Sequence, residues 1–322
     1  MANEIAVTDH NFPDLSIERN TLEDAGYSVR DIQAETEEEI IRHCKNSVAL
    51  LNQYQTISER VFTELEQLEV IGRYGIGVDT IDLSTATEYG VAVVNVPEYC
   101  INEVAEHTIA LLLSIYRQIP NYDRQFRDGE WDWKAGQPLH RFSESTIGLV
   151  GFGQIPRKVA ESLDGFNLRI VASDPNVDKD TMADYGVKKV NFESLVDTAE
   201  VISIHTPLIE STQNLFDEEV FKQMRNDAIL INTSRGGVVN TDDLIGALQD
   251  DHIRGAAIDV LADEPPKKDN VLRSIDDVIV TPHTAWYSEE SIQELRRTVA
   301  ENVLQVLRGE EITDIINEVA LP

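Results

Sequence analysis

The sequence predicts an α/β protein built from two doubly wound parallel-sheet domains. Short apolar runs rich in β-branched residues alternate with segments of helical spacing along most of the chain. The 322 residues are enough for two domains of ordinary size. At residues 146–174 a strand, a glycine turn, a helix and a second strand follow one another, which is the order that opens a doubly wound domain.

The first hundred residues predict a small parallel-sheet layer. Strand-like apolar runs occupy residues 5–7, 48–51, 70–73 and 91–94, and helical patterns occupy residues 17–25, 37–43, 59–68 and 83–89. Residues 73–79, with the sequence R-Y-G-I-G-V-D, place two glycines at the carboxyl end of a predicted strand. Ligands bind at that edge in open α/β sheets, although a plain glycine turn fits the segment equally well.

Residues 146–174 carry a dinucleotide-binding pattern. Gly151 permits a tight turn after the strand, and Gly153 lets the backbone approach a pyrophosphate at the following helix N-terminus. The third fingerprint position is Pro156 instead of Gly or Ala, which the first turn of a helix tolerates. Asp174 ends the second strand, and its carboxylate favours NAD over NADP because it would repel a 2′-phosphate.

The remainder of the chain continues the alternation. A long helix is predicted over residues 98–117, strands over 187–190, 201–204, 228–232, 255–260 and 278–281, and a last helix from 289 to 308. Residues 121–142 are predicted to lie outside the regular elements, and their tryptophans pack either on a second subunit or within the chain. Each of the last four strands leads into a polar segment, so these segments should meet at one sheet edge.

Three residues of those polar segments suit the chemistry of a 2-oxo acid. Arg235 offers a fork that grips a carboxylate through two parallel hydrogen bonds. His283 can give a proton to a developing alkoxide as a hydride arrives. Pairing with Glu264 favours the imidazolium, which keeps the acid form available near neutral pH.

Composition narrows the classes of partner and compartment. The chain has 58 acidic and 27 basic residues, only nine of them lysine, for a net charge of −31. The acids are spread over every segment, which predicts a halophilic protein from a high-salt cytoplasm and no nucleic-acid partner. No long apolar run, signal peptide or metal-ligand pattern is present in the sequence, and Cys44 and Cys100 suggest a reducing cytoplasm.

The chain resembles the D-isomer-specific 2-hydroxyacid dehydrogenases. The resemblance rests on G-F-G-Q-I-P-R from Gly151, H-T-P-L from His205, N-T-S-R-G-G-V-V from Asn232, A-I-D-V-L-A-D-E-P from Ala257 and P-H-T-A from Pro282. It implies an NAD-binding Rossmann domain at residues 101–289, inserted into a flavodoxin-like substrate domain at 1–100 plus 290–322. The active site would lie in the cleft, and the protein would be a homodimer.

The resemblance also assigns residue roles. Arg235, Glu264 and His283 become the catalytic residues, and Ile76 and Gly77 offer backbone N–H groups to the substrate carboxylate. Arg73 and Trp286 join the substrate site, because R-Y-G-I-G and H-T-A-W look most like the C-terminal-binding-protein branch. Asp259 is expected to face the nicotinamide carboxamide. The predicted cofactor residues are Thr108, Gly151, Gly153, Gln154, Ile155, Asp174, Thr206, Pro207, Thr212, Thr233, Ser234 and Asp259.

Several functions share these motifs. The expected activity is reversible hydride transfer between NADH and a 2-oxo acid with a medium apolar side chain, with Trp286 as a wall of the pocket. The alternatives are an NAD(H)-dependent partner-binding scaffold and a phosphoglycerate dehydrogenase, which the H-T-A-W ending and the lack of a regulatory domain disfavour. Formate dehydrogenases of this fold have Gln where Glu264 stands.

Overall fold

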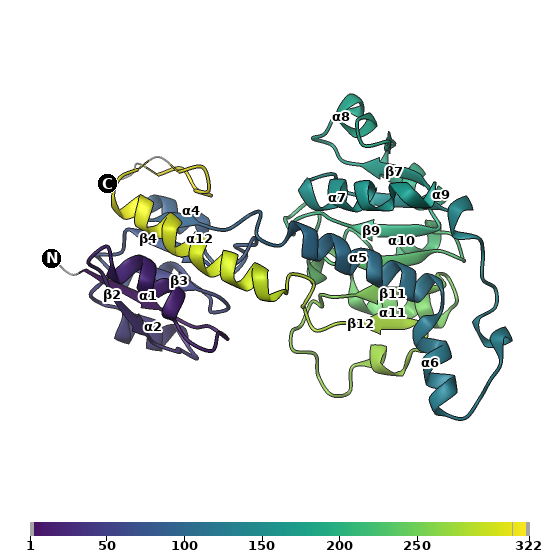
Figure 1. The fold of residues 1–322 in the computed structure, drawn as a ribbon, viewed down its shortest axis with the longest axis horizontal. Helices are drawn as coiled ribbons and strands as arrows, with labels where there is room; N and C mark the ends of the chain where they lie inside the picture. Colours follow the sequence, from purple (N-terminus) through teal and green to yellow (C-terminus); the bar gives the residue numbers. More distant parts are fainter. Residues whose placement is uncertain (1–2, 311, 320–322) are drawn as a thin grey trace. The chain divides into compact units, whose positions relative to one another are not determined.

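The computed structural model describes residues 3–310 and 312–319, which fall into two compact units. The N-terminal unit comprises the described residues up to Cys100 together with those from Ser288 onward. The central unit comprises Ile101–Tyr287. The chain therefore crosses between the units twice, once in each direction (Figure 1).

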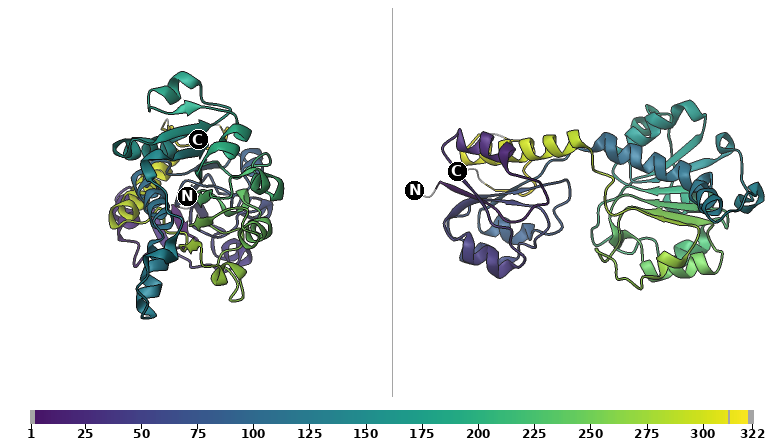
Figure 2. Two further views of the ribbon diagram at one scale, coloured as in Figure 1. Left: turned by 90° about the vertical axis from the view of Figure 1, so that its right-hand side faces the viewer. Right: turned by 60° about the horizontal axis from the view of Figure 1, so that its bottom comes forward.

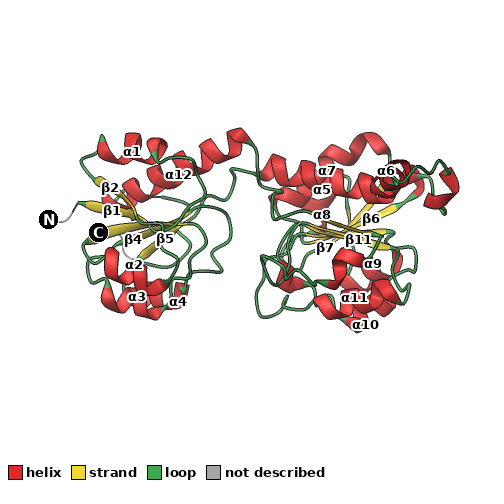
Figure 3. Cartoon of the chain, turned by 90° about the horizontal axis from the view of Figure 1, so that it is seen from below, coloured by secondary structure: helices red, strands yellow, loops and turns green. Residues whose placement is uncertain are grey.

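The N-terminal unit is a five-stranded parallel sheet in the order β2-β1-β3-β4-β5. Helices α1 and α12 lie on one face of the sheet and α2, α3 and α4 on the other (Figure 3). The strands are β1 (Glu4–Val7), β2 (Ser28–Asp31), β3 (Ser47–Asn52), β4 (Val70–Arg73) and β5 (Ala92–Val94). The helices are α1 (Ser16–Glu23), α2 (Glu37–His43), α3 (Glu59–Glu64), α4 (Leu83–Glu88) and α12 (Glu289–Leu307).

The central unit is a seven-stranded parallel sheet in the order β12-β11-β10-β9-β6-β7-β8. One apolar cluster packs α5 and α7 on one face, and a second packs α9, α10 and α11 on the other (Figure 3). The strands are β6 (Thr146–Val150), β7 (Arg169–Ser173), β8 (Lys188–Lys189), β9 (Val201–Ile204), β10 (Ile229–Asn232), β11 (Gly255–Ile258) and β12 (Val278–Val280). The helices are α5 (Ile101–Tyr116), α6 (Ile119–Arg127), α7 (Gln154–Leu163), α8 (Lys179–Ala183), α9 (Phe192–Thr198), α10 (Glu218–Gln223) and α11 (Thr241–Gln249).

Both sheets confirm the predicted fold class of two parallel α/β domains. The sequence missed strand β2, in which Val29 is the only buried residue, because an edge strand with one buried side chain leaves no alternating pattern. It also missed α6, which it placed outside the regular elements. None of the residues of α6 is buried, although Ile119, Tyr122 and Phe126 recur at helical spacing and could have indicated a helix.

Among the described residues, no helix is both long and apolar enough to span a membrane. Both cysteines are buried and neither forms a disulfide with a described residue, and burial raises the pKa of the Cys44 thiol to about 12. That thiol therefore stays protonated and unreactive at neutral pH.

Candidate active site

The glycine turn after β6 is shaped by close backbone contact. Gly151 has φ +92°, and a Cβ there would lie 2.6 Å from the carbonyl oxygen of His205. Gly153 directly precedes α7, and a Cβ at Gly153 would meet no atom within 4 Å. Because the space in front of Gly153 is open and the first N–H groups of α7 lie there, the turn fits a pyrophosphate. Pro156 lies in the first turn of α7, where a proline is tolerated.

Asp174 follows β7 and ties this strand end to the glycine turn. One carboxylate oxygen accepts the Phe152 N–H at 2.8 Å, and the other accepts the Asn176 N–H at 2.8 Å. A carboxylate can accept further hydrogen bonds, so both oxygens can still receive a ribose hydroxyl. The structure thus gives Asp174 a supporting role that the sequence did not predict.

We expect Asp174→Ala to weaken NADH binding and relax the preference for NADH over NADPH, because the ribose acceptor and the repulsive charge are both lost. Asp174→Asn keeps an oxygen for the Phe152 N–H and separates the effect of charge from that of the turn. The measurement is kcat/KM for each cofactor, with Asp178→Ala, which removes the cap of α8, as control. Faster turnover of the unmutated protein with NADPH at equal low concentrations would contradict this role.

The threonines predicted at the cofactor site lie on α5 or in the loops that follow β9 and β10. Thr108 is fully buried, donates to the Val104 carbonyl at 2.7 Å, and lies 2.9 Å from the hydroxyl of Thr233. Thr212 accepts the Ile209 N–H at 2.9 Å and lies 2.6 Å from the Pro207 carbonyl, which closes the loop after β9. Among the described residues, the buried hydroxyl of Thr206 has no hydrogen-bond partner. A buried polar atom of that kind suits a ligand-binding site.

His205, directly after β9, is a neutral histidine. Burial lowers the pKa of its imidazole to about 3, and its Nε2 lies 2.8 Å from the hydroxyl of Ser203. His205 is therefore not available as a proton donor at neutral pH, and a proton donor of the site would have to be another histidine.

Arg235 follows β10 in a turn that holds its backbone. Asn232 donates to the Arg235 carbonyl at 3.0 Å and accepts the Ser234 N–H at 3.0 Å. A Cβ on Gly236 would lie 2.0 Å from the carbonyl carbon of Leu261, so only glycine fits the next position. The positive charge of Arg235 also contributes to lowering the pKa of Glu264.

His283 and Glu264 form a hydrogen-bonded pair. His283 Nδ1 lies 2.7 Å from Glu264 Oε2, and Glu264 Oε1 accepts the Leu261 N–H at 2.8 Å. Burial raises the pKa of Glu264, but the hydrogen bonds from His283 and Leu261 outweigh it, so that this pKa lies below its usual value. An ionised Glu264 holds the proton on Nδ1 and leaves Nε2 of His283 to exchange protons with a ligand.

Asp259 holds the backbone of His283 in a strained conformation. His283 has φ +53°, which non-glycine residues rarely adopt. Its N–H donates to the Asp259 carbonyl at 2.8 Å, and the N–H groups of Thr284 and Ala285 donate to the two Asp259 carboxylate oxygens at 2.9 Å each. Asp259 is 2% exposed, so these bonds are shielded from water. The sequence expected Asp259 to face the nicotinamide, and did not predict this clamp.

His107 on α5 is a further polar residue that the sequence did not single out. Its Nε2 lies 3.0 Å from the hydroxyl of Thr281, and that hydroxyl donates to Asp259 at 2.5 Å. Trp286 follows in the same loop and donates its indole N–H to the His283 carbonyl at 2.8 Å. The sequence did not indicate a role for His107, because its partners Thr281 and Asp259 are far away in the chain, just after β12 and β11.

The loop after β4 belongs to the N-terminal unit and contains Arg73, Ile76 and Gly77. The Ile76 carbonyl accepts from the side chain of Asn95 at 2.6 Å. Within the part of the chain that the structure describes, the N–H groups of Ile76 and Gly77 donate no hydrogen bond. Two adjacent N–H groups of that kind can receive a carboxylate.

Tyr54 follows the neighbouring strand β3, which pairs Asn52 with Arg73. It is 52% exposed, and its N–H donates to the buried carboxylate of Asp9 at 2.5 Å. Tyr54 was not among the residues predicted from the sequence, where it appears as an aromatic residue just past a strand end.

The central parallel sheet, with its glycine turn before α7, has the arrangement of a dinucleotide-binding domain. Residues 109–285 match the D-isomer specific 2-hydroxyacid dehydrogenase, NAD binding domain, so the chain belongs to this family. The central unit thus contains the NAD-binding domain of the family. Among the described residues, no group of three or more His, Cys, Asp or Glu side chains is arranged to hold a metal ion.

Named relatives support the family assignment. The chain is 36% identical over 289 residues to a D-3-phosphoglycerate dehydrogenase of Methanocaldococcus jannaschii, covering 89% of this chain and 55% of the relative. It therefore spans about half the length of the curated relatives it matches.

Two solved structures resemble the whole chain. The NAD-complexed D-isomer specific 2-hydroxyacid dehydrogenase of Lactobacillus delbrueckii ssp. bulgaricus has TM-score 0.78 at 26% identity, covering 98% of this chain and 100% of the other. The NAD-dependent formate dehydrogenase of Staphylococcus aureus, in complex with NAD, has TM-score 0.86 at 28% identity, covering 98% and 99%.

Proposed function

We propose that this protein is an NAD-dependent D-2-hydroxyacid dehydrogenase that interconverts a 2-oxo acid and its 2-hydroxy acid. The observation that carries the proposal is the 2.7 Å pair of His283 Nδ1 and Glu264 Oε2 on a backbone held by Asp259. The residues that would hold the cofactor are the glycine turn at 151–153, Asp174 and the hydroxyls around Thr206 and Thr233. NADH, when bound, supplies the hydride.

The protein's own residues bind and protonate the substrate in this proposal. Arg235 grips the carboxylate and polarises the neighbouring carbonyl through its fork. The N–H groups of Ile76 and Gly77 take the remaining lone pairs of that carboxylate, and Arg73 adds positive charge beside them. His283 donates the proton on Nε2 to the forming alkoxide, while Glu264 stabilises the imidazolium.

For the substrate side chain we propose a medium apolar group, with Trp286 as one wall of the pocket. A phosphorylated substrate is the second candidate, because relatives at 36% and 34% identity are named D-3-phosphoglycerate dehydrogenases. A panel of 2-oxo acids, including 3-phosphohydroxypyruvate, assayed with NADH and NADPH at molar salt should decide. Higher kcat/KM for the phosphorylated acid would discard the apolar pocket.

Two variants connect that panel to Trp286. Trp286→Ala should flatten the selectivity among side chains, whereas Trp133→Ala, which removes a 69% exposed indole elsewhere, should not. NADH binding without turnover of any panel member would instead favour a partner-binding scaffold like that of the C-terminal-binding-protein branch, which residues 73–77 and 283–286 of this chain resemble.

We further propose that the protein is a homodimer formed through α6 and the segment after it. α6 projects from its unit in two views (Figures 1 and 2). Phe126, Trp131 and Trp133 are 64%, 89% and 69% exposed, and such aromatic surface is typical of an interface. Trp131→Ser with Trp133→Ser should convert a dimer into a monomer in light scattering, and a monomeric unmutated protein would contradict the proposal.

The charge of −31 leads us to propose adaptation to a high-salt cytoplasm. Unfolding in urea should show a lower midpoint at ~0.1 M than at ~1 M salt, because the Debye length falls from about 10 Å to about 3 Å and screens the repulsion. Salt also weakens exposed ion pairs such as Arg127–Asp123, at 2.7 Å. A higher unfolding midpoint in salt would therefore have to come from screening of the repulsion among the excess negative charges. An equal midpoint at both salt concentrations would contradict the adaptation.

A further inference from the structure

A buried ion pair in the N-terminal unit joins α1 to α12. Arg296 Nε and Nη2 donate to the two Glu18 oxygens at 2.8 and 2.7 Å, and the side chains of Arg296 and Glu18 are 5% and 0% exposed. The two helices lie side by side on the same face of the sheet (Figure 2). The two parallel hydrogen bonds from Arg296 fix the position of the Glu18 carboxylate in a place that is shielded from bulk water.

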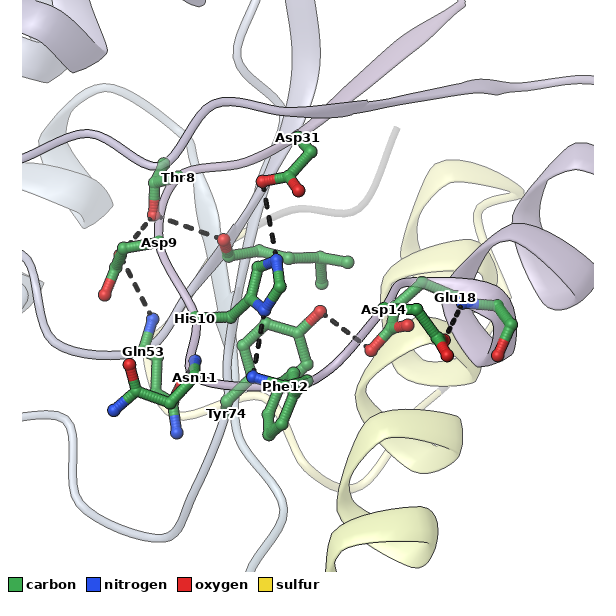
Figure 4. Close-up of polar contacts among 12 residues, drawn as sticks. Thr8, Asp9, His10, Asn11, Phe12, Asp14, Glu18, Asp31, Gln53 and Tyr74 are labelled. Carbon is green, nitrogen blue, oxygen red and sulfur yellow. Dashed lines mark hydrogen bonds and ion pairs between the residues drawn. The ribbon is translucent and has the colours of Figure 1, made fainter.

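Tyr74 brings a third side chain to this pair. Its hydroxyl donates to Glu18 Oε1 at 3.1 Å, and the residue is 1% exposed (Figure 4). Burial, reinforced by the charge of Glu18, raises the pKa of the phenol well above its usual value, so the hydroxyl remains a donor. The ring meets Phe12 edge-on at 5.0 Å, and Phe12 lies 4.8 Å below the guanidinium of Arg296.

The backbone of Tyr74 belongs to the loop after β4. The Tyr74 N–H donates to the Asn52 carbonyl at 2.8 Å, and the Tyr74 carbonyl accepts from Arg73 Nη1. Gly75 has φ +141°, and a Cβ there would collide with the same Arg73 nitrogen. The guanidinium of Arg73 therefore lies against the Cα of Gly75, which has no side chain. It is hydrogen-bonded to the carbonyl of Tyr74, and the side chain of Tyr74 reaches Glu18.

We propose that Tyr74 is a positioning residue that transmits the fixed geometry of the Glu18–Arg296 pair to the guanidinium of Arg73 and to the Ile76 and Gly77 N–H groups. This inference rests on the proposed function, in which that loop binds the substrate carboxylate. The phenol anchors the loop from inside the unit, and the Tyr74 carbonyl orients Arg73 on the outside. Tyr74 itself touches neither substrate nor cofactor.

The test is Tyr74→Phe, which removes one hydroxyl and leaves the Glu18–Arg296 pair in place. The KM for the preferred 2-oxo acid should rise roughly five- to tenfold with kcat and the KM for NADH nearly unchanged, because uniform binding of the carboxylate is weakened. Tyr116→Phe is the matched control, since that buried hydroxyl lies 2.7 Å from Ser145 in the central unit. The control should leave the KM for the 2-oxo acid unchanged. Equal KM values in the Tyr74 variant and the control would overturn the proposal.

Two further measurements separate positioning from general stability. In an Arg73→Ala background, Tyr74→Phe should raise KM less than it does in the unmutated protein, because only its effect on the Ile76 and Gly77 N–H groups remains, whereas a full additional rise would overturn the proposal. Hydrogen–deuterium exchange at residues 73–78 should be faster in Tyr74→Phe than in Tyr116→Phe, and unchanged exchange would overturn it even if no substrate is found. Absence of turnover by the unmutated protein would count against the proposed function alone.

Discussion

His283→Ala should lower kcat for 2-oxo acid reduction by about 10²–10⁴, the usual contribution of a positioned general acid. The imidazole bonded to Glu264 at 2.7 Å is the side chain that we propose delivers the proton, and alanine leaves only water for that task. The KM for NADH should hardly change, because the glycine turn and Asp174 lie on other strands. Steady-state kinetics with NADH and the preferred acid provide the measurement.

The control for this variant is His140→Ala, which removes an exposed histidine of the same unit. It should retain full activity. If both variants were equally active, His283 would not be the acid. If loss of activity in His283→Ala came with a lost NADH site, the cause would be collapse of the loop that Asp259 clamps rather than missing chemistry.

Arg235→Lys should lower kcat/KM for the 2-oxo acid roughly 10- to 150-fold, which corresponds to the ~1.5–3 kcal/mol of a charge-assisted hydrogen bond. An ammonium keeps the charge but cannot make two parallel bonds to a carboxylate. The loss should appear mainly for substrates with a free carboxylate and should not alter NADH affinity.

Arg225→Lys is the matched control for this second variant. Arg225 also grips a carboxylate with two nitrogens, donating to Asp227 at 2.8 and 3.0 Å, but it does so at a partly exposed site that precedes β10 instead of following it. The Arg225 variant should lose some stability and keep its kcat/KM. Equal kcat/KM in the Arg235 variant and the unmutated protein would show that Arg235 does not hold the substrate carboxylate.

The sequence predicted the elements that carry strong local signals. Gly151 could be assigned because a positive φ and close backbone contact demand glycine, and the strands around it could be assigned because apolar β-branched runs report burial on both faces. Arg235, Glu264 and His283 lie in the segments that follow β10, β11 and β12. These strands are parallel neighbours, so their carboxyl ends lie at the same edge of the sheet. The structure adds a 2.7 Å contact between His283 Nδ1 and Glu264 Oε2.

The elements that the sequence missed are those with little burial. β2 buries one residue, so no alternating pattern marks it, and α6 buries none, although its apolar residues recur at helical spacing. The strand predicted at 187–190 is shorter in the structure, where β8 comprises only Lys188–Lys189. β8 lies at the edge of the sheet and pairs with β7 alone.

What the sequence alone determined, therefore, is the fold class, the cofactor turn and the types of reactive side chain, because turn glycines, apolar periodicity and strand-end residues are properties of short segments. The tertiary structure alone decided which residues support them. Asp259 clamps the left-handed His283, and Glu18 with Arg296 holds Tyr74, although Glu18 and Arg296 are 278 residues apart. Such partners cannot be predicted from local pattern, because a buried carboxylate and its donors meet only when distant helices and strands pack together.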